Sequence, residues 1–411
     1  MKIENKSIYH QHNEIDENIQ KNIENLRVRR RNRSILLIVA ILVVLSILNI
    51  LSVGFYKEDL FSVKRHLQIM CGSTVAALIP MTLDYEIYRK PFMKLLLFLG
   101  SVGVLLFVIF GPGSIIKSVN GARGWINLGI TTIQPAEILK IPFIILLANV
   151  LAKGEEKKLP ALTIFINSLI VFGIFAVLIN EQNDLGTVIH YGAIYIFMFF
   201  LTKVDKKVVT GLVAAGVSTA VTAGYFIYKY SDKLSGGYKL ERIKIFLEGL
   251  FTDKYIGNAD IGYQVGQSLL AFGNGGLLGR SYGNGVQKYN YLPEIHTDFI
   301  MALFGEEMGF IGVLIVIILF FTLYNLIAET GISCKNIFGR YLALGIGGYI
   351  ISQFLINIFV ALGLLPVFGI PMPIFSYGGS SVITIFAGIG IILNINKSMF
   401  CLLYTSDAAD D

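Results

Sequence analysis

Apolar residues in this chain are gathered into long blocks rather than spaced at the intervals of an amphipathic helix or strand. A block of roughly 17 residues or more is long enough to cross the hydrocarbon of a membrane as an α-helix. The fourth and sixth blocks are short for a span, so we expect them to begin within the polar segments before them. The pattern predicts ten spans, at residues 34–55, 66–83, 92–111, 138–152, 161–180, 185–201, 209–228, 299–325, 341–362 and 380–396.

The predicted fold is an all-α polytopic membrane protein of about ten transmembrane helices. Composition agrees, because 54% of the 411 residues are hydrophobic and 15% are charged, whereas a soluble domain carries about 25% charged residues. Residues 1–33 would form a basic cytoplasmic tail, 34–396 the membrane domain and 397–411 a C-terminal tail. Residues 401–411 are acidic and small and do not resemble the sequence before them. We expect that end to be a cloning or assembly scar rather than native sequence.

A basic run at residues 27–33 abuts the first apolar block, which is typical of a cytoplasmic topology anchor. Lys and Arg lie mainly on the same side as this run, apart from those in the 229–298 loop, which is too long for the positive-inside rule to govern. We therefore expect both termini inside and this large loop, between the seventh and eighth spans, outside. The net charge of +6 reflects such anchors and does not indicate nucleic-acid binding.

The polar, glycine-rich segments 112–137, 229–298 and 363–379 all fall on the predicted outer side, so we expect the chemistry there. Asp298 stands where the large loop enters the eighth span. Partial desolvation at that depth would raise its pKa toward the range of a general base. The competing interpretation is a helix N-cap, in which Thr297 or Asp298 satisfies free backbone N–H groups.

Two further carboxylates, Glu306 and Glu307, lie inside the eighth span. Charged groups within a span are costly and are usually functional or paired, and the local sequence leaves both interpretations open. Asp298 and Glu306 share a face only roughly, so a metal site is weakly indicated, and a divalent cation, magnesium or manganese, is left open as a cofactor. We expect His296 to be a hydrogen-bonding partner of the site rather than a catalyst.

Cationic residues of the outer segments are candidates for contact with a phosphate group. Arg242, Arg280 and Lys288 share the large loop and could neutralise a diphosphate, although a solvated loop would carry the same charges. Arg123, near the only tryptophan, could meet headgroups or a ligand phosphate. The segment 366–381 contains three prolines and cannot be regular helix. Its Gly-Gly-Ser-Ser end opens the tenth span, where a helix N-terminus suits an anion; structural capping alone is the competing interpretation.

Other polar residues have plainer structural interpretations. Pro135 and Asp184 suit helix starts. Gln353 and Asn357 lie four residues apart on one face of the ninth span. Their amides need hydrogen-bond partners in hydrocarbon, and interhelical packing is favoured over substrate contact.

Three motifs in combination resemble the SEDS family, which includes the RodA, FtsW and SpoVE proteins. They read LPE-x-HTDF at 292–299, GEE-x-GF-x-G at 305–312 and SYGGSS at 376–381. The resemblance covers roughly residues 34–396. The chain departs from the family's usual motifs at Gly124, Ala136, Asn183, Ser281 and Gly285, which puts fine substrate positioning and the subfamily in doubt rather than the class.

The resemblance implies that the chain polymerises glycan strands from lipid II in the bacterial cytoplasmic membrane, with the active site on the outer face. Asp298 matches the family's essential aspartate and would deprotonate the GlcNAc 4-hydroxyl of acceptor lipid II. That oxygen would attack C1 of the MurNAc on the lipid-linked chain, giving an inverted β-1,4 bond and undecaprenyl diphosphate. The implied partners are lipid II, the lipid-linked glycan, membrane lipids and a class B penicillin-binding protein, with no nucleic acid.

The expected site goes beyond the aspartate, although the choice among elongation, division and sporulation is left open. Substrate-binding candidates are Arg123, Arg242, Arg280, Lys288, Glu294, His296, Ser376 and Ser380. Supporting candidates are Gln264, Gln267, Glu306, Glu307, Asp184 and Asn357.

Two other functions compete with polymerisation. A lipid II flippase fits many spans with polar residues inside them, but transport needs a path lined from both faces, and the polar motifs here lie on one side. A scaffold that recruits the penicillin-binding protein does not explain an outer carboxylate in so specific a motif. The sequence therefore favours the polymerase.

Overall fold

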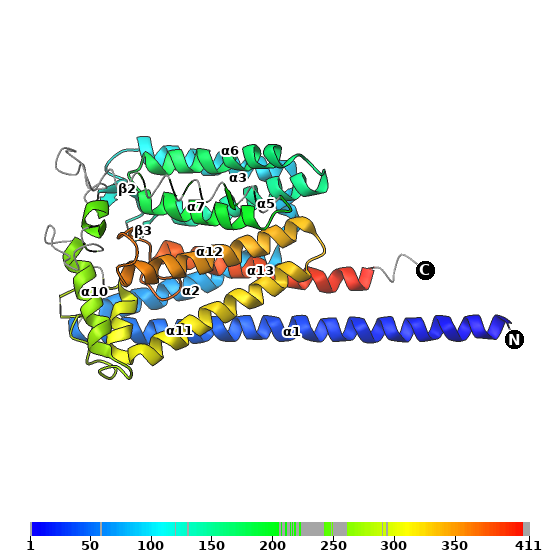
Figure 1. Cartoon of the computed structure of the whole chain (residues 1–411), viewed down its shortest axis with the longest axis horizontal. Coiled ribbons are helices and arrows are strands. Elements are labelled where there is room, and N and C mark those ends of the chain that lie inside the picture. Colours follow the sequence, from blue (N-terminus) through cyan, green and yellow to red (C-terminus); the bar gives the residue numbers. More distant parts are fainter. Residues whose placement is uncertain are drawn as a thin grey trace.

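Long helices make up most of the structure and run roughly side by side along one direction (Figure 1). Most of the predicted seventh span at 209–228 and much of the 229–298 loop lie outside the part of the chain that is described. In this computed structural model, the described residues are 2–57, 60–119, 121–129, 131–204, 242–247, 261–289, 291–292 and 295–405, with isolated positions between 207 and 249.

Seven helical segments of the described residues are long and apolar enough to cross a membrane, and each coincides with a predicted span. The predicted span at 66–83 corresponds to α2 (Leu60–Thr82), and the one at 185–201 to the shorter apolar helix α7 (Leu185–Phe200). The multi-pass helical fold is confirmed, and the number of ten spans stays a prediction. The seven segments are Asn22–Gly54, Pro91–Phe110, Pro135–Glu156, Ala161–Asn180, Ile300–Ser333, Ile337–Ala361 and Gly379–Met399.

The first helix, α1, is continuous from Lys2 to Lys57, so the basic run at 27–33 belongs to the same helix as the first span. The remaining helices are η1 (Tyr85–Arg89), α3 (Pro91–Phe110), α4 (Pro135–Ile138), α5 (Lys140–Glu156), α6 (Ala161–Asn180), α10 (Ile261–Gly275), α11 (Ile300–Ser333), α12 (Ile337–Ala361) and α13 (Gly379–Thr405).

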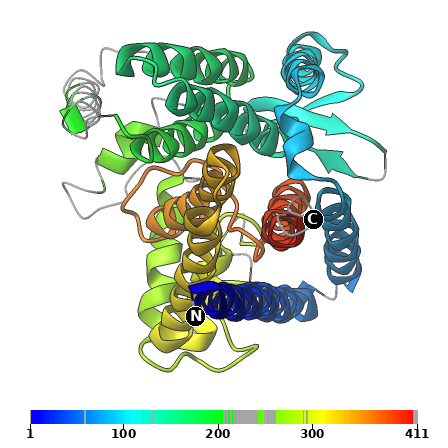
Figure 2. The same ribbon diagram turned by 90° about the vertical axis from the view of Figure 1, so that its right-hand side faces the viewer.

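The two ends of the bundle differ in character. The start of α1 and the end of α13 lie at the same end, where α1 extends well beyond the other helices (Figure 1). Figure 2 looks along the bundle from that end. The opposite end carries α10 and the strands, which belong to the segments predicted to lie outside. Termini on one side agree with an even number of spans.

A small antiparallel sheet at that opposite end was not predicted from the sequence. Its strands are β1 (Ile116–Val119), β2 (Ala122–Asn127) and β3 (Thr132–Ile133), in the order β1-β2-β3. The strands are short, and the β1–β2 pairing shifts register between Lys117 and Ser118, so no regular alternation marks them in the sequence. The sheet forms one wall of the cavity described below.

The two short spans behave differently from one another. The fourth begins at Pro135, within the preceding polar segment, as predicted. The expectation that the sixth also begins early is wrong, because α7 starts at Leu185. The Asp184 side chain caps that helix by accepting a hydrogen bond of 3.0 Å from the Thr187 N–H, and this N-cap fixes the position at which the helix begins.

Burial divides the helices into an inner and an outer set. In the most apolar 18-residue stretch of each helix, 83% of the residues are buried in α12 and in α13. The corresponding share is 17% in α3 and 22% in α6. The inner helices therefore form the core of the bundle, while the outer ones present apolar side chains to their surroundings. This arrangement places the start of α13 at the centre of the strand-bearing end.

Candidate active site

A cavity of about 560 Å³ lies at the strand-bearing end of the bundle. Its walls come from the small sheet, the segment around α4, the start of α7, α10, the turn before α11, the proline-rich segment and the start of α13. This volume falls within the range of about 300–1,000 Å³ usual for small-molecule sites. Segments far apart in the chain thus meet at one hollow, at the end predicted to face outward.

Asp298 lines this cavity from the turn that precedes α11. The N-cap of α11 is Phe299, so neither Thr297 nor Asp298 holds the capping position that the competing interpretation gave them. Gly369 lies beside the carboxylate, since a Cβ added there would be 3.7 Å from Oδ2 of Asp298. The Asp298 backbone carbonyl accepts a hydrogen bond of 2.8 Å from the Asn357 amide.

A second carboxylate, Asp184, lines the same cavity at the start of α7. It accepts hydrogen bonds of 2.8 Å from the Thr187 hydroxyl and from the Gln134 amide. The backbone N–H of Gln134 donates in turn to the Ser380 hydroxyl over 2.9 Å. These bonds join the starts of α4, α7 and α13, so the wall is rigidly built.

The cavity brings together five residues that the sequence singled out: Asp298, Asp184, Arg242, Gln264 and Ser380. Arg242 also donates a hydrogen bond of 2.8 Å to the carbonyl of Val367 in the proline-rich segment. Its guanidinium supplies a positive charge to a cavity that holds carboxylates. A charged group of this kind can bind a phosphate through several N–H donors at once.

Sequence reasoning missed Glu137 as a residue of the cavity, although it ends the outer segment 112–137 in which we expected chemistry. Glu137 lines the cavity and is 3% exposed, and its Oε1 pairs closely with the ammonium of Lys140, which is fully buried. The Lys140 ammonium also lies 5.5 Å from the ring centre of Tyr349. The signal that could have found this pair is the spacing of three residues, which places both side chains on one helical face.

Glu306, Glu307 and Lys288 form a separate buried cluster, which does not line the cavity. Oε1 of Glu307 accepts hydrogen bonds from Lys288 Nζ at 3.0 Å and from the Ser52 hydroxyl of α1 at 2.6 Å. Oε2 of Glu306 accepts a bond of 3.0 Å from a backbone N–H, and its Oε1 lies 3.8 Å from Arg280. The structure favours the ion-pair interpretation of both glutamates.

The same cluster affects a tyrosine of the neighbouring loop. Burial and the negative charge of Glu307 raise the pKa of Tyr282 above its ordinary value. Its hydroxyl stays protonated and donates a hydrogen bond of 2.7 Å to the carbonyl of Leu48 in α1. The loop is therefore tied to α1 at two points, here and through Lys288.

Besides Asn357, four other predicted residues lie apart from the cavity lining. Arg123 donates to the carbonyl of Gly111, and Ser376 is fully buried. The carbonyl of His296 accepts a hydrogen bond of 3.0 Å from the N–H of Tyr377, joining two of the three family motifs. Gln267 faces a separate groove, and Glu294 lies outside the described residues.

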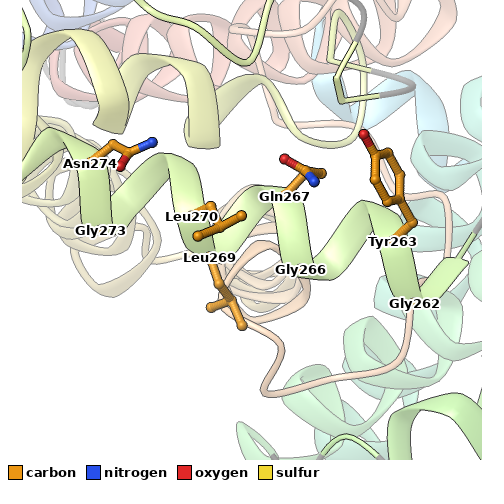
Figure 3. A pocket seen from close by; sticks show the side chains of 8 residues that line it. All are labelled: Gly262, Tyr263, Gly266, Gln267, Leu269, Leu270, Gly273 and Asn274. Atoms are coloured by element: carbon orange, nitrogen blue, oxygen red, sulfur yellow. The ribbon is translucent and has the colours of Figure 1, made fainter. Parts of the chain in front are cut away.

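That groove, of about 540 Å³, runs along the exposed side of α10. Tyr263, Gln267 and Asn274 point to the same side of the helix there (Figure 3). Gln264, one position from Tyr263, belongs to the cavity instead. The structure thus separates the two glutamines that the sequence had grouped together.

The described residues contain no group of three or more His, Cys, Asp or Glu side chains placed to hold a metal ion. Glu137, Asp184 and Asp298 line one cavity, yet Glu137 is paired with Lys140 and Asp184 with neighbouring donors. The carboxylates are therefore not assembled into a donor set. The prediction of magnesium or manganese stays a prediction.

The fold and the cavity define a multi-pass helical membrane protein with a polar site at one end of its bundle. The sequence pattern of the FtsW, RodA and SpoVE family, described as cell cycle proteins, matches residues 31–399. The chain therefore belongs to this family, the SEDS family, and the resemblance of its motifs is confirmed.

Relatives and solved structures agree with this assignment. The chain is 34% identical to the probable peptidoglycan glycosyltransferase FtsW of Geobacter sp. (strain M18), covering 84% of this chain and 89% of that one. It is 36% identical to the protein of the same name in Haemophilus influenzae, covering 88% of each. A chain of a peptidoglycan synthase complex shares its fold at 24% identity, with a TM-score of 0.69 over 89% of this chain and 97% of that one. Thermus thermophilus RodA gives a TM-score of 0.59 at 24% identity over 89% and 96%.

Proposed function

We propose that this chain is a peptidoglycan glycosyltransferase that joins lipid-linked disaccharides into glycan strands. The observation that supports this most is the position of Asp298, whose carboxylate lines a cavity beside Gly369 and shares that cavity with Arg242. The cavity therefore offers a base for an incoming hydroxyl and a positive charge for a departing diphosphate. The names of the relatives support the same reaction.

The reaction needs one proton transfer and one displacement. Asp298 takes the proton from the GlcNAc 4-hydroxyl of acceptor lipid II. The oxygen attacks C1 of the lipid-linked sugar from the face opposite the diphosphate, so the new β-1,4 bond forms with inversion as the bond to undecaprenyl diphosphate breaks. Arg242 stabilises the negative charge that the leaving diphosphate gains. No step of this scheme passes through a metal ion.

The cavity end of the bundle would face the outside of the bacterial cytoplasmic membrane. The basic run at 27–33 supports this, because such a run is typical of the cytoplasmic side and belongs to the helix that extends from the opposite end. The likeness in fold to a chain of a peptidoglycan synthase complex supports a penicillin-binding protein as partner, with lipid II and the lipid-linked glycan as substrates. The identity of the partner would determine whether the glycan strands serve elongation, division or sporulation.

The test is polymerisation of lipid II by the purified chain, alone and with its penicillin-binding protein. Asp298→Asn keeps the shape of the side chain and the backbone bond to Asn357, and it should make no glycan strands. Glu181→Gln changes an exposed residue two positions before the cavity-lining Asn183, and it should polymerise as the unaltered chain does. Strands made by Asp298→Asn at the normal rate would refute the proposal.

The assay also separates the polymerase from its competitors when it is run in detergent. A flippase has no membrane to work across in micelles, and a scaffold alone makes no glycosidic bonds. Strand formation by the isolated chain in detergent therefore supports catalysis. Strand formation that depends wholly on a second enzyme would favour the scaffold.

A further inference from the structure

A residue that lines the cavity has a buried carboxylate oxygen that none of the described residues satisfies. Glu137 lines the cavity and is 3% exposed. Its Oε1 pairs with Lys140, whereas its Oε2 is buried and finds no hydrogen-bond partner among the residues that the structure describes. A buried charged oxygen without a donor costs free energy, so it is expected to accept a hydrogen bond from a ligand or a water molecule.

We propose that Oε2 of Glu137 binds a sugar hydroxyl of the lipid-linked substrate. The inference rests on the proposed function, since it places a saccharide in this cavity. A carboxylate oxygen accepts hydrogen bonds only, so its ligand must offer an O–H or N–H group. Sugars present many hydroxyl donors, and the diphosphate oxygens, which are acceptors, are excluded from this position by charge.

Lys140 acts as the positioning residue for Glu137. Its ammonium is fully buried, lies over the ring of Tyr349 and pairs with the other carboxylate oxygen. This pairing fixes the rotamer of Glu137 and keeps its negative charge balanced inside the bundle. The unsatisfied oxygen is thus held in one position, on a residue that lines the cavity.

The neighbours of Glu137 suit a saccharide as well. Gln134 lies one turn before it. The side-chain amide of Gln134 donates a hydrogen bond to Asp184 and its backbone N–H donates one to Ser380, and these bonds fix the wall around Glu137. Trp125 also lines the cavity, and its indole offers a large apolar face. A sugar ring has polar edges and apolar faces, so it can meet both kinds of group.

The variant that tests the proposal is Glu137→Gln. Its amide oxygen can keep the contact with Lys140, which puts an NH₂ donor where the structure has a charged acceptor. We expect KM for lipid II to rise about tenfold or more, because a hydrogen bond to a charged group is lost. We expect kcat to change much less. Glu181→Gln is the matched control, since it removes an exposed carboxylate two positions before the cavity-lining Asn183.

A direct binding measurement avoids dependence on turnover. Trp125 is the only tryptophan in the chain and lines the cavity, so its fluorescence can report lipid II binding in the inactive Asp298→Asn background. Adding Glu137→Gln should weaken binding about tenfold or more. Binding of equal strength in the two variants would overturn the inference and leave the proposed function intact.

Deoxy analogues of lipid II identify the contact. Removal of the hydroxyl that contacts Glu137 should weaken binding to the unaltered chain. The same removal should not weaken binding to Glu137→Gln further, because that variant has already lost the contact. If Glu137→Gln proves unstable, the analogues still decide with the unaltered chain, because equal binding of all of them overturns the proposal. Recovery of Glu137→Gln by added magnesium or manganese would also overturn it, since that carboxylate would then serve a cation.

Discussion

The side-chain amide of Asn357 donates a hydrogen bond of 2.8 Å to the backbone carbonyl of Asp298. The same amide nitrogen donates a second bond of 2.8 Å to the carbonyl of Ile370 in the proline-rich segment. One buried side chain of α12 therefore sets the distance between the turn that carries the proposed base and the loop that faces it. The sequence favoured a role for Asn357 in interhelical packing. In the structure its amide contacts the turn that carries Asp298, so it also helps to position that residue.

Replacing Asn357 by Leu should lower both stability and activity. Two buried carbonyls would lose their donor, which costs on the order of 1–3 kcal/mol for each unsatisfied group. The freed turn would let Asp298 drift from the acceptor hydroxyl, so we expect kcat for lipid II polymerisation to fall at least tenfold, with a smaller change in KM. Steady-state kinetics and the midpoint of thermal unfolding measure the two effects.

Asn149 supplies the control for that change. Its amide nitrogen also donates to two backbone carbonyls, those of Tyr88 and Ile145, at 3.1 and 2.9 Å. These bonds tie α5 to the short helix η1, away from the cavity lining. Asn149→Leu should lower the unfolding midpoint while kcat of the folded protein is kept. Equal losses of kcat in both variants would show that Asn357 has no special role in placing Asp298.

Lys288 should matter for stability rather than for diphosphate binding. Its ammonium is 3% exposed and is shared among Glu307, Ser52 and the carbonyl of Gly283. Removing one partner of such a pair leaves an uncompensated buried charge, which costs about 3–5 kcal/mol. Lys288→Met should therefore lower the unfolding midpoint strongly, and Lys288→Met with Glu307→Leu should recover much of the loss. The fraction of the Lys288→Met variant that folds should keep the KM of the unaltered chain for lipid II.

Arg280 offers the exposed counterpart of this ion pair. Its side chain is 43% exposed and its guanidinium lies 3.8 Å from Glu306. Pairs of this kind contribute about 0–1 kcal/mol, so Arg280→Met should change the unfolding midpoint little. A raised KM in Lys288→Met, with normal stability, would restore the sequence-based view that this lysine meets the diphosphate.

The sequence predicts those features that depend on one segment at a time. The hydrophobic blocks give the helices, and the motif around Asp298 gives the centre of the site. The sequence does not predict which segments contact one another, because the periodicity of apolar residues does not indicate which helices pack together. Lys288 meets Ser52 from α1. Glu137 lines the cavity and pairs with Lys140, whereas its motif alone indicates only a helix start. Contacts of this kind exist only once the bundle has formed.

A kink within α11 should be sensitive to a single methyl group. Gly309 has φ of +67° inside that helix, a conformation that suits glycine, and a Cβ there would lie 2.3 Å from the backbone nitrogen of Gly279. Gly309→Ala should therefore destabilise the protein by more than 1 kcal/mol, through strain and overpacking together. Gly266→Ala in α10 is the control, since a Cβ there meets nothing within 4 Å. That helical position should be neutral or gain up to about 1 kcal/mol, as thermal unfolding will report.

The wall facing Asp298 can be moved by a change in α7. A Cβ at Gly186 would lie 2.0 Å from the backbone carbonyl oxygen of Phe368, and both residues line the cavity. Gly186→Ala must push the proline-rich segment aside, and with it Gly369, which lies against the Asp298 carboxylate. We expect an overpacking cost of about 1–3 kcal/mol and a fall in the rate of lipid II polymerisation. Gly192→Ala, in the same helix, meets only the Phe172 ring at 3.7 Å and should leave both unchanged. Normal polymerisation by Gly186→Ala would mean that the proline-rich segment does not hold the substrate against Asp298.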